Sequence, residues 1–367
     1  MSTPRLEIRL DLLTDNATSL IDRLRARGIT VCAVTKVTLG SPEIAAALMA
    51  AGATSLGESR VRNVETLRRG GVDAPVLLVR SPLLSEVDRV VRVTDVSCNS
   101  EFATLHRLSE TAQRQRRIHG VVLMVELGDL REGLMPGSLH AAAQRVVDLP
   151  GLTLRGIGTN LACQNGVVPD VDNMGELSAL ADGVEQRCSV RLDIVSGGNS
   201  SNIGWALDPA SDIGRVNHLR LGESILLGTD PVDRSAIEGL RPDVFTLVAE
   251  VIESQTKPSQ PWGSISYTAF GDGVEPDASV RPMHRVIVAL GEQDVDPTDL
   301  VPPAGFEILG ASSDHLVLDA GDQVVSVGQE LRFGIGYRAL LRAMTSPFVT
   351  RDIRSAAVLT VPGCSPT

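Results

Sequence analysis

The chain has 367 residues, of which 43% are hydrophobic, so it can bury a large core and is expected to fold as two domains. Its net charge of −11 argues against nonspecific binding to nucleic acid or to an anionic membrane, because no basic block stands against the acidic background. The sequence shows neither a signal-peptide pattern nor an apolar run of about 18 residues, so we expect a cytoplasmic protein without a membrane span.

Short apolar, β-branched runs alternate with helix-like segments through the first part of the chain. Eight such runs lie at residues 31–35, 53–56, 76–79, 95–98, 121–127, 153–158, 191–195 and 218–221. Between them, Ser41-Pro42-Glu43 marks the start of one helix, and Ser100-Glu101 opens a longer helix that is expected to end near His119. This alternation predicts an α/β fold, a closed (β/α)₈ TIM barrel over residues 13–238, rather than an open doubly wound sheet.

After residue 238 the pattern changes to short strands separated by glycine and proline. Strands are expected at residues 244–252, 285–290, 307–309, 316–318 and 330–335. They predict a β-rich C-terminal domain over residues 239–367. A strand-like segment at residues 5–10 precedes the barrel, and we expect residues 1–12 to pack with the C-terminal domain.

The five cysteines are odd in number, widely spaced and without a CxxC pair. They are Cys32, Cys98, Cys163, Cys188 and Cys364. Such a set predicts small reduced hydrophobic residues rather than a disulfide framework or a zinc site. Cys163 follows an expected strand, so the alternative for this residue is that it faces a functional site.

Lysine is scarce in this chain, since Lys36 and Lys257 are the only two among 34 lysine and arginine residues. Lys36 stands at the end of an apolar β-type run, whereas Lys257 lies beside a proline in an expected loop. A partly desolvated lysine can lose its proton near neutral pH and form a Schiff base with an aldehyde cofactor, which arginine cannot do. The alternative is a strand-end lysine without a chemical role.

Polar residues and glycines gather at the expected carboxyl ends of the strands, where barrel enzymes carry their reactive groups. These positions are Lys36, Arg80, Asn99, Asp129, Arg131, Asn160, residues 196–202 and residues 220–224. Loops after the seventh and eighth strands commonly bind phosphate through backbone amides. A loop of Gly, Ser and Asn is often only a turn, but its position opposite a strand-end lysine favours a phosphorylated ligand. An aldehyde and a phosphate together indicate pyridoxal phosphate.

Seven segments, in order and over nearly the whole chain, carry a resemblance to a known family. They are residues 33–37, 126–133, 156–161, 196–200, 219–223, 310–315 and 337–347. The chain resembles the alanine-racemase-like pyridoxal-phosphate proteins of fold type III, and within them the amino-acid racemases that include ornithine racemase. The resemblance implies pyridoxal phosphate as cofactor and a racemase as the activity.

Carried over residue by residue, the resemblance makes Lys36 the Schiff-base lysine and one of the proton-transfer bases. It implies that the cofactor is held by Asn199, Ser200, Arg220, Gly222 and Tyr337. Arg220 would donate to the pyridine nitrogen without protonating it, because a guanidinium does not readily give up a proton. Arg131 would steer the substrate carboxylate, and its structural alternative is a surface ion pair with Asp129 or Glu132.

The base on the opposite face is not assigned by the resemblance. Alanine racemases take a tyrosine from the partner subunit in a Gly-Tyr-Ala-Asp-Gly stretch, whereas residues 291–296 here read Gly-Glu-Gln-Asp-Val-Asp. Asp294 and His315 are the main candidates, followed by Glu292 and Tyr267. Their structural alternatives are a turn former for Asp294, an interior histidine for His315 and a packing residue for Tyr267. Loops shared with a partner's site would imply a head-to-tail homodimer.

The expected reaction interconverts the enantiomers of a free amino acid by removing and returning the α-proton. Acidic residues at the expected site favour a substrate with a second amine, such as ornithine or lysine; they are Asp129, Glu132, Glu223 and Glu292. One alternative is an enzyme of the D-threonine-aldolase or dehydratase type, but no metal site is expected, because Asp314-His315 has no further close histidine or cysteine. The other is a pyridoxal-phosphate carrier, against which the second domain argues.

Overall fold

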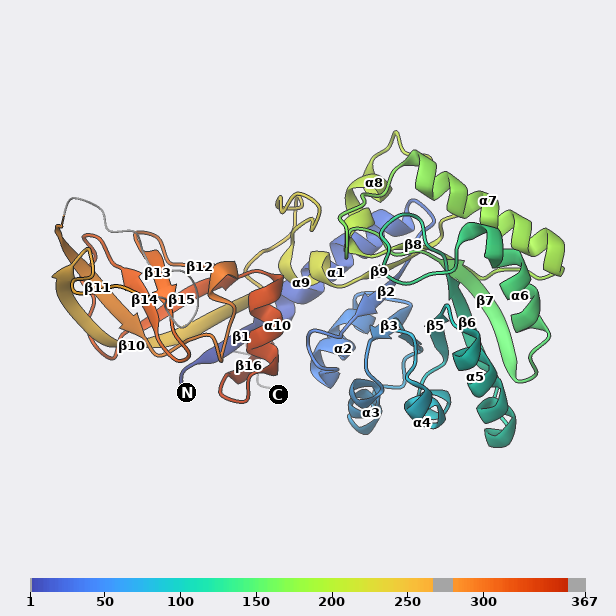
Figure 1. Cartoon of the computed structure of the whole chain (residues 1–367), viewed down its shortest axis with the longest axis horizontal. Coiled ribbons are helices and arrows are strands. Elements are labelled where there is room, and N and C mark those ends of the chain that lie inside the picture. The colour runs from blue at the N-terminus through green and yellow to red at the C-terminus, as the bar shows by residue number, and fades with distance from the viewer. Residues whose placement is uncertain (1, 267–279, 356–367) are drawn as a thin grey trace, which may run out of the picture. The chain divides into compact units, whose positions relative to one another are not determined.

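The computed structural model describes residues 2–266 and 280–355 (Figure 1). The chain divides into two compact units, Leu13–Pro242 and the combination of Met1–Leu12 with Asp243–Thr367. The boundary expected after residue 238 lies slightly too early, because Asn16 holds the backbone of Arg241 through hydrogen bonds of 2.7 and 2.8 Å. Across the two described ranges, no helix has both the length and the apolar character needed to cross a membrane.

The first unit is a closed barrel of eight parallel strands that follow one another in chain order, with the last strand pairing with the first. The strands are β2 (Thr30–Val34), β3 (Ser55–Glu58), β4 (Val76–Leu78), β5 (Val96–Asn99), β6 (His119–Met124), β7 (Leu152–Gly158), β8 (Ile194–Gly198) and β9 (His218–Leu221). The predicted (β/α)₈ barrel is therefore confirmed, and each of the eight expected strands overlaps an observed one.

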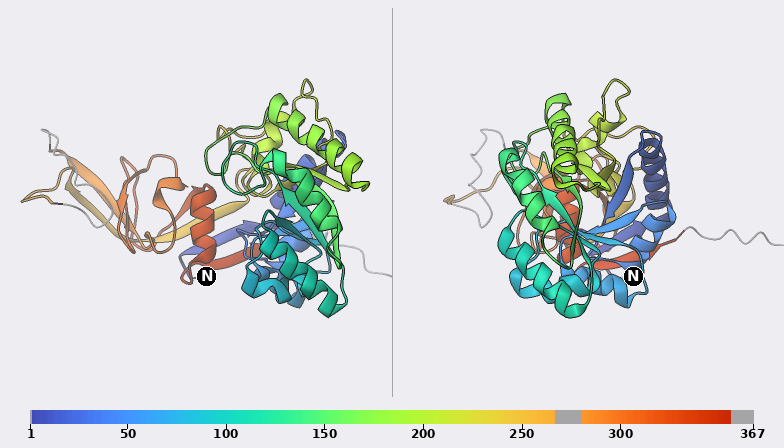
Figure 2. Two further views of the ribbon diagram at one scale, coloured as in Figure 1. Left: turned by 45° about the vertical axis from the view of Figure 1, so that its right-hand side comes forward. Right: turned by 90° about the vertical axis from the view of Figure 1, so that its right-hand side faces the viewer.

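Helices surround the strands of this unit, as the right-hand view of Figure 2 shows. They are α1 (Leu10–Arg25), α2 (Pro42–Ala50), α3 (Val61–Arg69), α4 (Val87–Val93), α5 (Phe102–Gln115), α6 (Leu139–Val147), α7 (Val171–Cys188), α8 (Ile203–Leu207) and α9 (Glu223–Leu227). Short 3₁₀ turns precede several of them: η1 (Leu84–Glu86), η2 (Pro136–Ser138) and η3 (Ser200–Asn202). The expected start of α2 is confirmed, since Ser41 accepts a hydrogen bond from the amide of Ile44 and Pro42 occupies the first turn.

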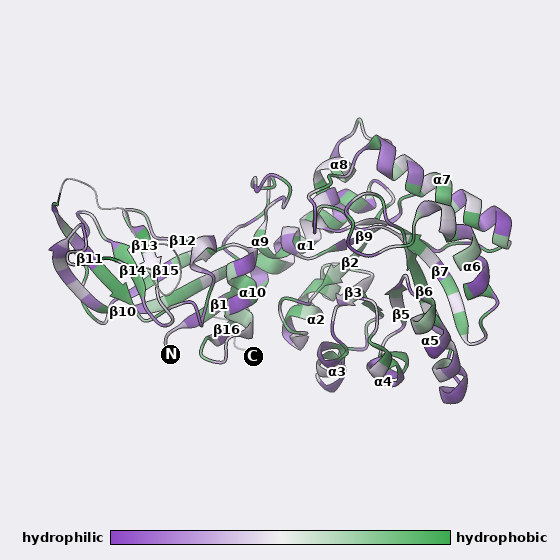
Figure 3. Ribbon diagram, viewed as in Figure 1, coloured by the Kyte–Doolittle hydropathy of each residue, from purple (hydrophilic) through white to green (hydrophobic). Residues whose placement is uncertain are grey.

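Alternate residues of each strand pack on opposite sides of the barrel wall. On β6, Val121 and Leu123 belong to the large cluster shared with the surrounding helices, whereas Val122 and Met124 belong to a smaller cluster with Cys32. Hydrophobic residues colour most of β6, while α7 and the end of α5 carry long hydrophilic stretches (Figure 3). The larger of these two apolar clusters is therefore the one shared by strands and helices.

Several expected boundaries in the barrel are wrong, among them the end of one helix and the start of one loop. The helix that begins after Ser100-Glu101 ends at Gln115, because Arg116 adopts a left-handed conformation (φ 53°) and His119 already pairs in β6. The loop expected to begin at Ser196 begins later, because β8 continues to Gly198. Free Cys32, Cys98 and Cys188 are buried as expected.

The second unit is an eight-stranded sheet in the order β12-β15-β10-β11-β14-β13, with β1 and β16 off this path. Its strands are β1 (Arg5–Arg9), β10 (Phe245–Pro258), β11 (Pro282–Val288), β12 (Leu300–Val301), β13 (Glu307–Ala311), β14 (Leu316–Asp319), β15 (Glu330–Ile335) and β16 (Thr350–Arg354). A 3₁₀ turn, η4 (Pro297–Asp299), and a helix, α10 (Tyr337–Thr345), complete it. The N-terminal strand belongs to this unit, in which β1 pairs with β10. The sequence patterns did not reveal β12, β16 or α10.

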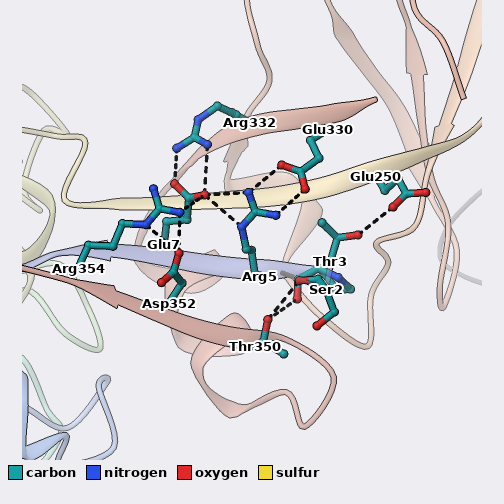
Figure 4. Close-up of polar contacts among 11 residues, drawn as sticks. Ser2, Thr3, Arg5, Glu7, Glu250, Glu330, Arg332, Thr350, Asp352 and Arg354 are labelled. Carbon is teal, nitrogen blue, oxygen red and sulfur yellow. Dashed lines mark hydrogen bonds and ion pairs between the residues drawn. The ribbon is translucent and has the colours of Figure 1, made fainter. Parts of the chain in front are cut away.

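A chain of ion pairs joins β1 to β15 and β16 within this unit (Figure 4). Glu7 is 3% exposed, and its carboxylate lies 2.5 Å from Arg332, 2.9 Å from Arg5 and 2.9 Å from Arg354. Arg5 also reaches Glu330 at 2.6 Å. Burial alone would raise the pKa of Glu7, but the hydrogen bonds from Arg332 and Arg5 outweigh it and lower the pKa to about 2.

Candidate active site

The turn that carries Lys36 follows directly on β2 at the carboxyl end of the barrel. Residues 36–40 form this turn, which we call the Lys36 turn. Gly40 closes it with φ 66°, and a Cβ atom at this position would lie 2.6 Å from the backbone oxygen of Asn63. Only glycine suits both the left-handed conformation and this close approach. The Lys36 turn is therefore packed tightly against α3.

Lys36 is accessible to solvent, yet its pKa is lowered. Desolvation by the surrounding protein is the main cause, the charges of Arg131 and Arg220 act in the same direction, and Cys163 and Glu223 act against them. The two observations are compatible, because water reaches part of the side chain while the protein around it still removes much of the bulk solvation. A lowered pKa brings the amine closer to the neutral form that reacts with an aldehyde.

Arg220 lies on β9 and is 5% exposed. One of its terminal nitrogens donates to the hydroxyl of Ser196, and the other donates to the backbone oxygen of Thr159 at 2.7 Å and to Oδ1 of Asn160 at 3.4 Å. Within the described ranges these acceptors are all uncharged oxygens. A buried guanidinium held in this way keeps its positive charge and can present a donor to a ligand.

His218 lies next to Arg220 on the same strand and shares its partner, since Nδ1 is 2.9 Å from the Ser196 hydroxyl. Burial, together with the charge of Arg220, lowers the pKa of His218 to about 3. The imidazole is therefore neutral at physiological pH, and Arg220 remains the cation of this pair.

Asn160 and Asn199 join the loops that follow β7 and β8. Nδ2 of Asn199 donates to Oδ1 of Asn160 at 3.1 Å and to the backbone oxygen of Leu161 at 2.9 Å, while its Oδ1 accepts from the amide of Ser201 at 2.8 Å. Nδ2 of Asn160 is buried and has no hydrogen-bond partner among the described residues. An orphaned buried donor beside Arg220 is suited to a bound acceptor.

Three donors converge on the hydroxyl oxygen of Ser200, which is 4% exposed. The amides of Gly222 and Ser224 lie 3.2 Å from it, and the Ser224 hydroxyl lies 3.1 Å from it. A hydroxyl oxygen has two lone pairs, so three donors exceed what Ser200 alone can accept. A phosphate oxygen would satisfy such a group of donors.

Asp129 and Arg131 occupy the segment after β6, and the structure gives them different surroundings. Asp129 is fully buried, and its carboxylate accepts hydrogen bonds from the amides of Cys163, Gln164 and Asn165 at 3.1, 2.9 and 3.0 Å. It is therefore a loop anchor, and the expectation that it offers an acidic group to the substrate is wrong. Arg131 forms an ion pair with Glu132, as its structural alternative supposed, and also acts on the pKa of Lys36.

The remaining candidates belong to the β-rich unit. Tyr337 is the first residue of α10. Asp294 is 7% exposed and accepts from the amide of Gly291 at 3.1 Å, as the turn-former alternative supposed. His315 is exposed, and its Nδ1 lies 2.7 Å from Asp314, so it is not an interior histidine. Tyr267 lies outside the described residues.

Glu292 also forms an ion pair within its own unit, since its carboxylate lies 2.6 Å from Arg342. Among the four acidic residues expected at the site, Glu223 is the one whose charge raises the pKa of Lys36. Within the described ranges, no group of three or more His, Cys, Asp or Glu residues could hold a metal ion.

The arrangement fits pyridoxal phosphate on three observations. A lysine with a lowered pKa, a converging set of donors at Ser200 and a buried arginine with neutral acceptors all lie at the carboxyl end of one barrel. The unpartnered amide of Asn160 adds a donor between the arginine and the Ser200 loop. These residues match the aldehyde, the phosphate and the ring nitrogen of the expected cofactor.

Glu58 and Asn63 lie beside the Lys36 turn, and the sequence patterns did not reveal them. The third strand was expected to end at Leu56, so Glu58 was not counted among the strand-end residues, but β3 continues to Glu58. The sequence signal that could have revealed Glu58 is a carboxylate residue at the end of an apolar strand. Asn63 lies in α3, and nothing in its sequence surroundings distinguishes it from a surface residue.

Comparisons with known proteins agree with this geometry. Residues 8–231 match the family described as "Alanine racemase, N-terminal domain". The chain is 38% identical to a lysine racemase of Thermotoga maritima, with 96% of this chain and 98% of the relative covered. It is 36% identical to an ornithine racemase of Acetoanaerobium sticklandii, with 95% and 99% covered.

The fold is also that of a solved alanine racemase. The crystal structure of the enzyme from Streptomyces lavendulae matches with a TM-score of 0.74 over 96% of this chain and 98% of that chain, at 17% sequence identity. The family match spans most of the chain, and both sequence relatives cover nearly all of it. The chain therefore belongs to the alanine racemase family of amino-acid racemases.

Proposed function

We propose that the chain is a pyridoxal-phosphate-dependent racemase of a basic amino acid, with ornithine and lysine as the substrates to test first. The observation that carries the cofactor assignment is the position of Lys36, whose pKa is lowered by desolvation at the carboxyl end of the barrel. The relatives named lysine racemase and ornithine racemase support a substrate with a distal amine.

Each barrel residue has a part in this proposal. Pyridoxal phosphate, when bound, withdraws electrons from the substrate and so makes its α-proton acidic. Lys36 would hold the cofactor between turnovers and, when released, would accept or return the α-proton at Nζ. Ser200, with the amides of Gly222 and Ser224, would bind the phosphate, and Arg220 would donate a hydrogen bond to the ring nitrogen.

Residues around the mouth of the barrel would orient the substrate. Arg131 would bind its carboxylate, for which it must exchange its present partner Glu132. Glu223, whose charge acts on Lys36, is the acidic residue that we assign to the distal ammonium group. The side-chain amide of Asn199 would support the phosphate loop by bonding to the neighbouring loop rather than by binding the phosphate itself.

For the opposite face we propose His315 as the base, since it is an exposed imidazole paired with Asp314. Asp294 is a weaker choice, because its carboxylate is buried in its own turn and also accepts from Ser346 at 3.3 Å. Delivery of His315 from a second subunit would make the enzyme a head-to-tail homodimer, in which Tyr337 joins the phosphate site.

The test uses the purified full-length protein with added pyridoxal phosphate. We expect visible absorbance from the bound cofactor, and inversion of L- and D-ornithine or L- and D-lysine on chiral chromatography, with slower inversion of alanine. In deuterated water the product should carry deuterium on its α-carbon, since the α-proton exchanges with solvent.

Other outcomes would overturn the proposal. Bound cofactor without inversion of any amino acid would indicate a carrier, and release of glycine and an aldehyde from D-threonine would indicate an aldolase. Faster inversion of alanine than of the basic amino acids would reject the substrate class.

A further inference from the structure

A buried carboxyl group lies directly beside the Lys36 turn. Glu58, the last residue of β3, is completely buried. Its Oε1 accepts a hydrogen bond of 2.6 Å from the hydroxyl of Thr35, and its Oε2 accepts one of 3.0 Å from Nδ2 of Asn63. Both oxygens are therefore bound by side chains of the protein, one from the residue before Lys36 and one from α3.

These two bonds hold opposite ends of the Lys36 turn. Two backbone hydrogen bonds also hold Thr35. Its amide donates to the backbone oxygen of Gly57 at 2.9 Å, and its own backbone oxygen accepts from the amide of Gly40 at 3.3 Å. At the other end, Gly40 packs against Asn63, the same residue that binds Glu58. Glu58 thus connects the start of the turn with the surface against which the turn closes.

The protonation of Glu58 is sensitive to its surroundings. Burial raises the pKa of Glu58 to about 7, and the hydrogen bonds from Thr35 and Asn63 and the positive charge of Lys36 oppose this rise. A further titratable group near Glu58 is the buried thiol of Cys32 on β2, whose pKa is raised mainly by burial and also by the charge of Glu58. A buried carboxyl group is an unfavourable way to stabilise a strand end, which indicates a role beyond stability.

We propose that Glu58 is the positioning residue for Lys36, holding the Lys36 turn through Thr35 and Asn63 so that the amine is presented to the cofactor. Glu58 acts through the turn and is not itself a catalytic residue. This inference rests on the proposed function, because it assumes that Lys36 is covalently linked to pyridoxal phosphate.

Three substitutions distinguish the effect of the two hydrogen bonds of Glu58 from the effect of its charge. Glu58→Gln keeps both hydrogen bonds, since its amide can accept from Asn63 and donate to the Thr35 hydroxyl, but it removes the negative charge that the carboxyl carries above about pH 7. Glu58→Ala removes both bonds, and Thr35→Val removes the hydroxyl while leaving the carboxyl in place. Glu43→Gln is the matched control, because Glu43 follows the same turn on α2 but is exposed.

The measurement is the visible absorbance of the Lys36-linked cofactor in the full-length protein, titrated with pyridoxal phosphate at several pH values. We expect Glu58→Ala and Thr35→Val to weaken the link about tenfold, the equivalent of about 1.4 kcal/mol. Glu58→Gln should form the link but shift its pH profile to lower pH, because loss of the negative charge lowers the pKa of the Lys36 amine. Glu43→Gln should match the wild type.

The outcomes distinguish this inference from the function on which it rests. A wild-type protein without absorbance would overturn the proposed function and this inference with it. The inference alone would be overturned if the wild type shows the absorbance and both Thr35→Val and Glu58→Gln match it. The match would have to hold for the affinity for pyridoxal phosphate and for the pH profile of the link. Thermal unfolding of each variant identifies a purely structural role of Glu58. Such a role would lower Tm without moving the pH profile, and this result would also count against the inference.

Discussion

Oδ2 of Asp129 accepts a hydrogen bond of 2.9 Å from the backbone amide of Gln164, and so joins the segment after β6 to the segment after β7. The loop from residue 161 to residue 165, which also contacts Asn199, depends on this buried carboxylate for its conformation. We therefore expect Asp129 to control the stability of one side of the barrel mouth.

Asp129→Asn should lower the free energy of unfolding by about 2 kcal/mol, because one of the two oxygens that bind backbone amides is replaced by a donor. Urea unfolding of the full-length protein measures this change. Asp193→Asn is the control, since Asp193 is an exposed partner of Arg155 and such surface pairs contribute less than about 1 kcal/mol. Equal effects of the two substitutions would show that the loop is not anchored by Asp129.

Glu7 should make the stability of the protein depend on acid pH. Its pKa falls from 4.5 to about 2 in the folded protein, so its contribution is complete above about pH 5 and is lost as the pH falls from 4.5 towards 2. The difference in unfolding free energy between the wild type and Glu7→Gln should be about 3 kcal/mol at neutral pH and should shrink over this window.

Chemical unfolding from pH 2 to pH 7 measures this difference. Asp22→Asn is the control, because Asp22 pairs with Arg25 on the surface, with both side chains more than half exposed. A constant difference between the wild type and Glu7→Gln across the whole range would contradict the prediction.

The two lysines allow a direct test of the covalent link. Reduction of the cofactor-loaded protein with borohydride, followed by digestion and mass spectrometry, should label the peptide that contains Lys36 and leave the peptide with Lys257 unlabelled. Lys36→Arg should lose the label and about 10²-fold or more of racemase activity, since arginine cannot act as a base near neutral pH. Lys257→Arg should retain both, because Lys257 is half-buried on β10, not in the expected loop, and forms an ion pair with Glu253 there. Label on Lys257 alone would reject the assignment of Lys36.

Ser200 and Ser201 form a matched pair for the phosphate site. Ser200→Ala should weaken binding of pyridoxal phosphate about tenfold, because the donors that converge on Ser200 lose the residue that orients them. Ser201→Ala should have a smaller effect, since among residues 2–266 and 280–355 its hydroxyl donates to the backbone of Leu161 over a long distance of 3.4 Å. Pyridoxal lacks the phosphate, so the two variants should bind it with equal affinity. If Ser200→Ala still weakened the binding of pyridoxal, the phosphate would have to lie elsewhere.

The sequence predicted the barrel well, because short runs that contain apolar and β-branched residues alternate with helix-like segments eight times in the first part of the chain. Helix ends were harder to predict. The end of α5 depends on a left-handed conformation at Arg116, a residue type for which this conformation carries no sequence signal. The helix α10 lies in a region dominated by strand signals, so its short amphipathic pattern was not recognised.

Within the site, the residues at strand ends were predictable and their partners were not. Lys36, Arg220 and Ser200 follow from their positions in the strand pattern. The burial of Asp129 depends on a loop more than 30 residues further along the chain, since its partners begin at Cys163. The contact of Glu58 with Thr35 likewise depends on the pairing of β3 with β2, which no local pattern contains.

The parallel pairing of β1 with β16 brings residues 5–9 beside residues 350–354. During synthesis the ribosome makes the entire barrel between these two strands, so the barrel can form while β1 still lacks its final neighbour. An uncovered strand edge readily pairs with other chains. We therefore expect nascent chains stalled before residue 350 to aggregate through β1, although their barrels are complete.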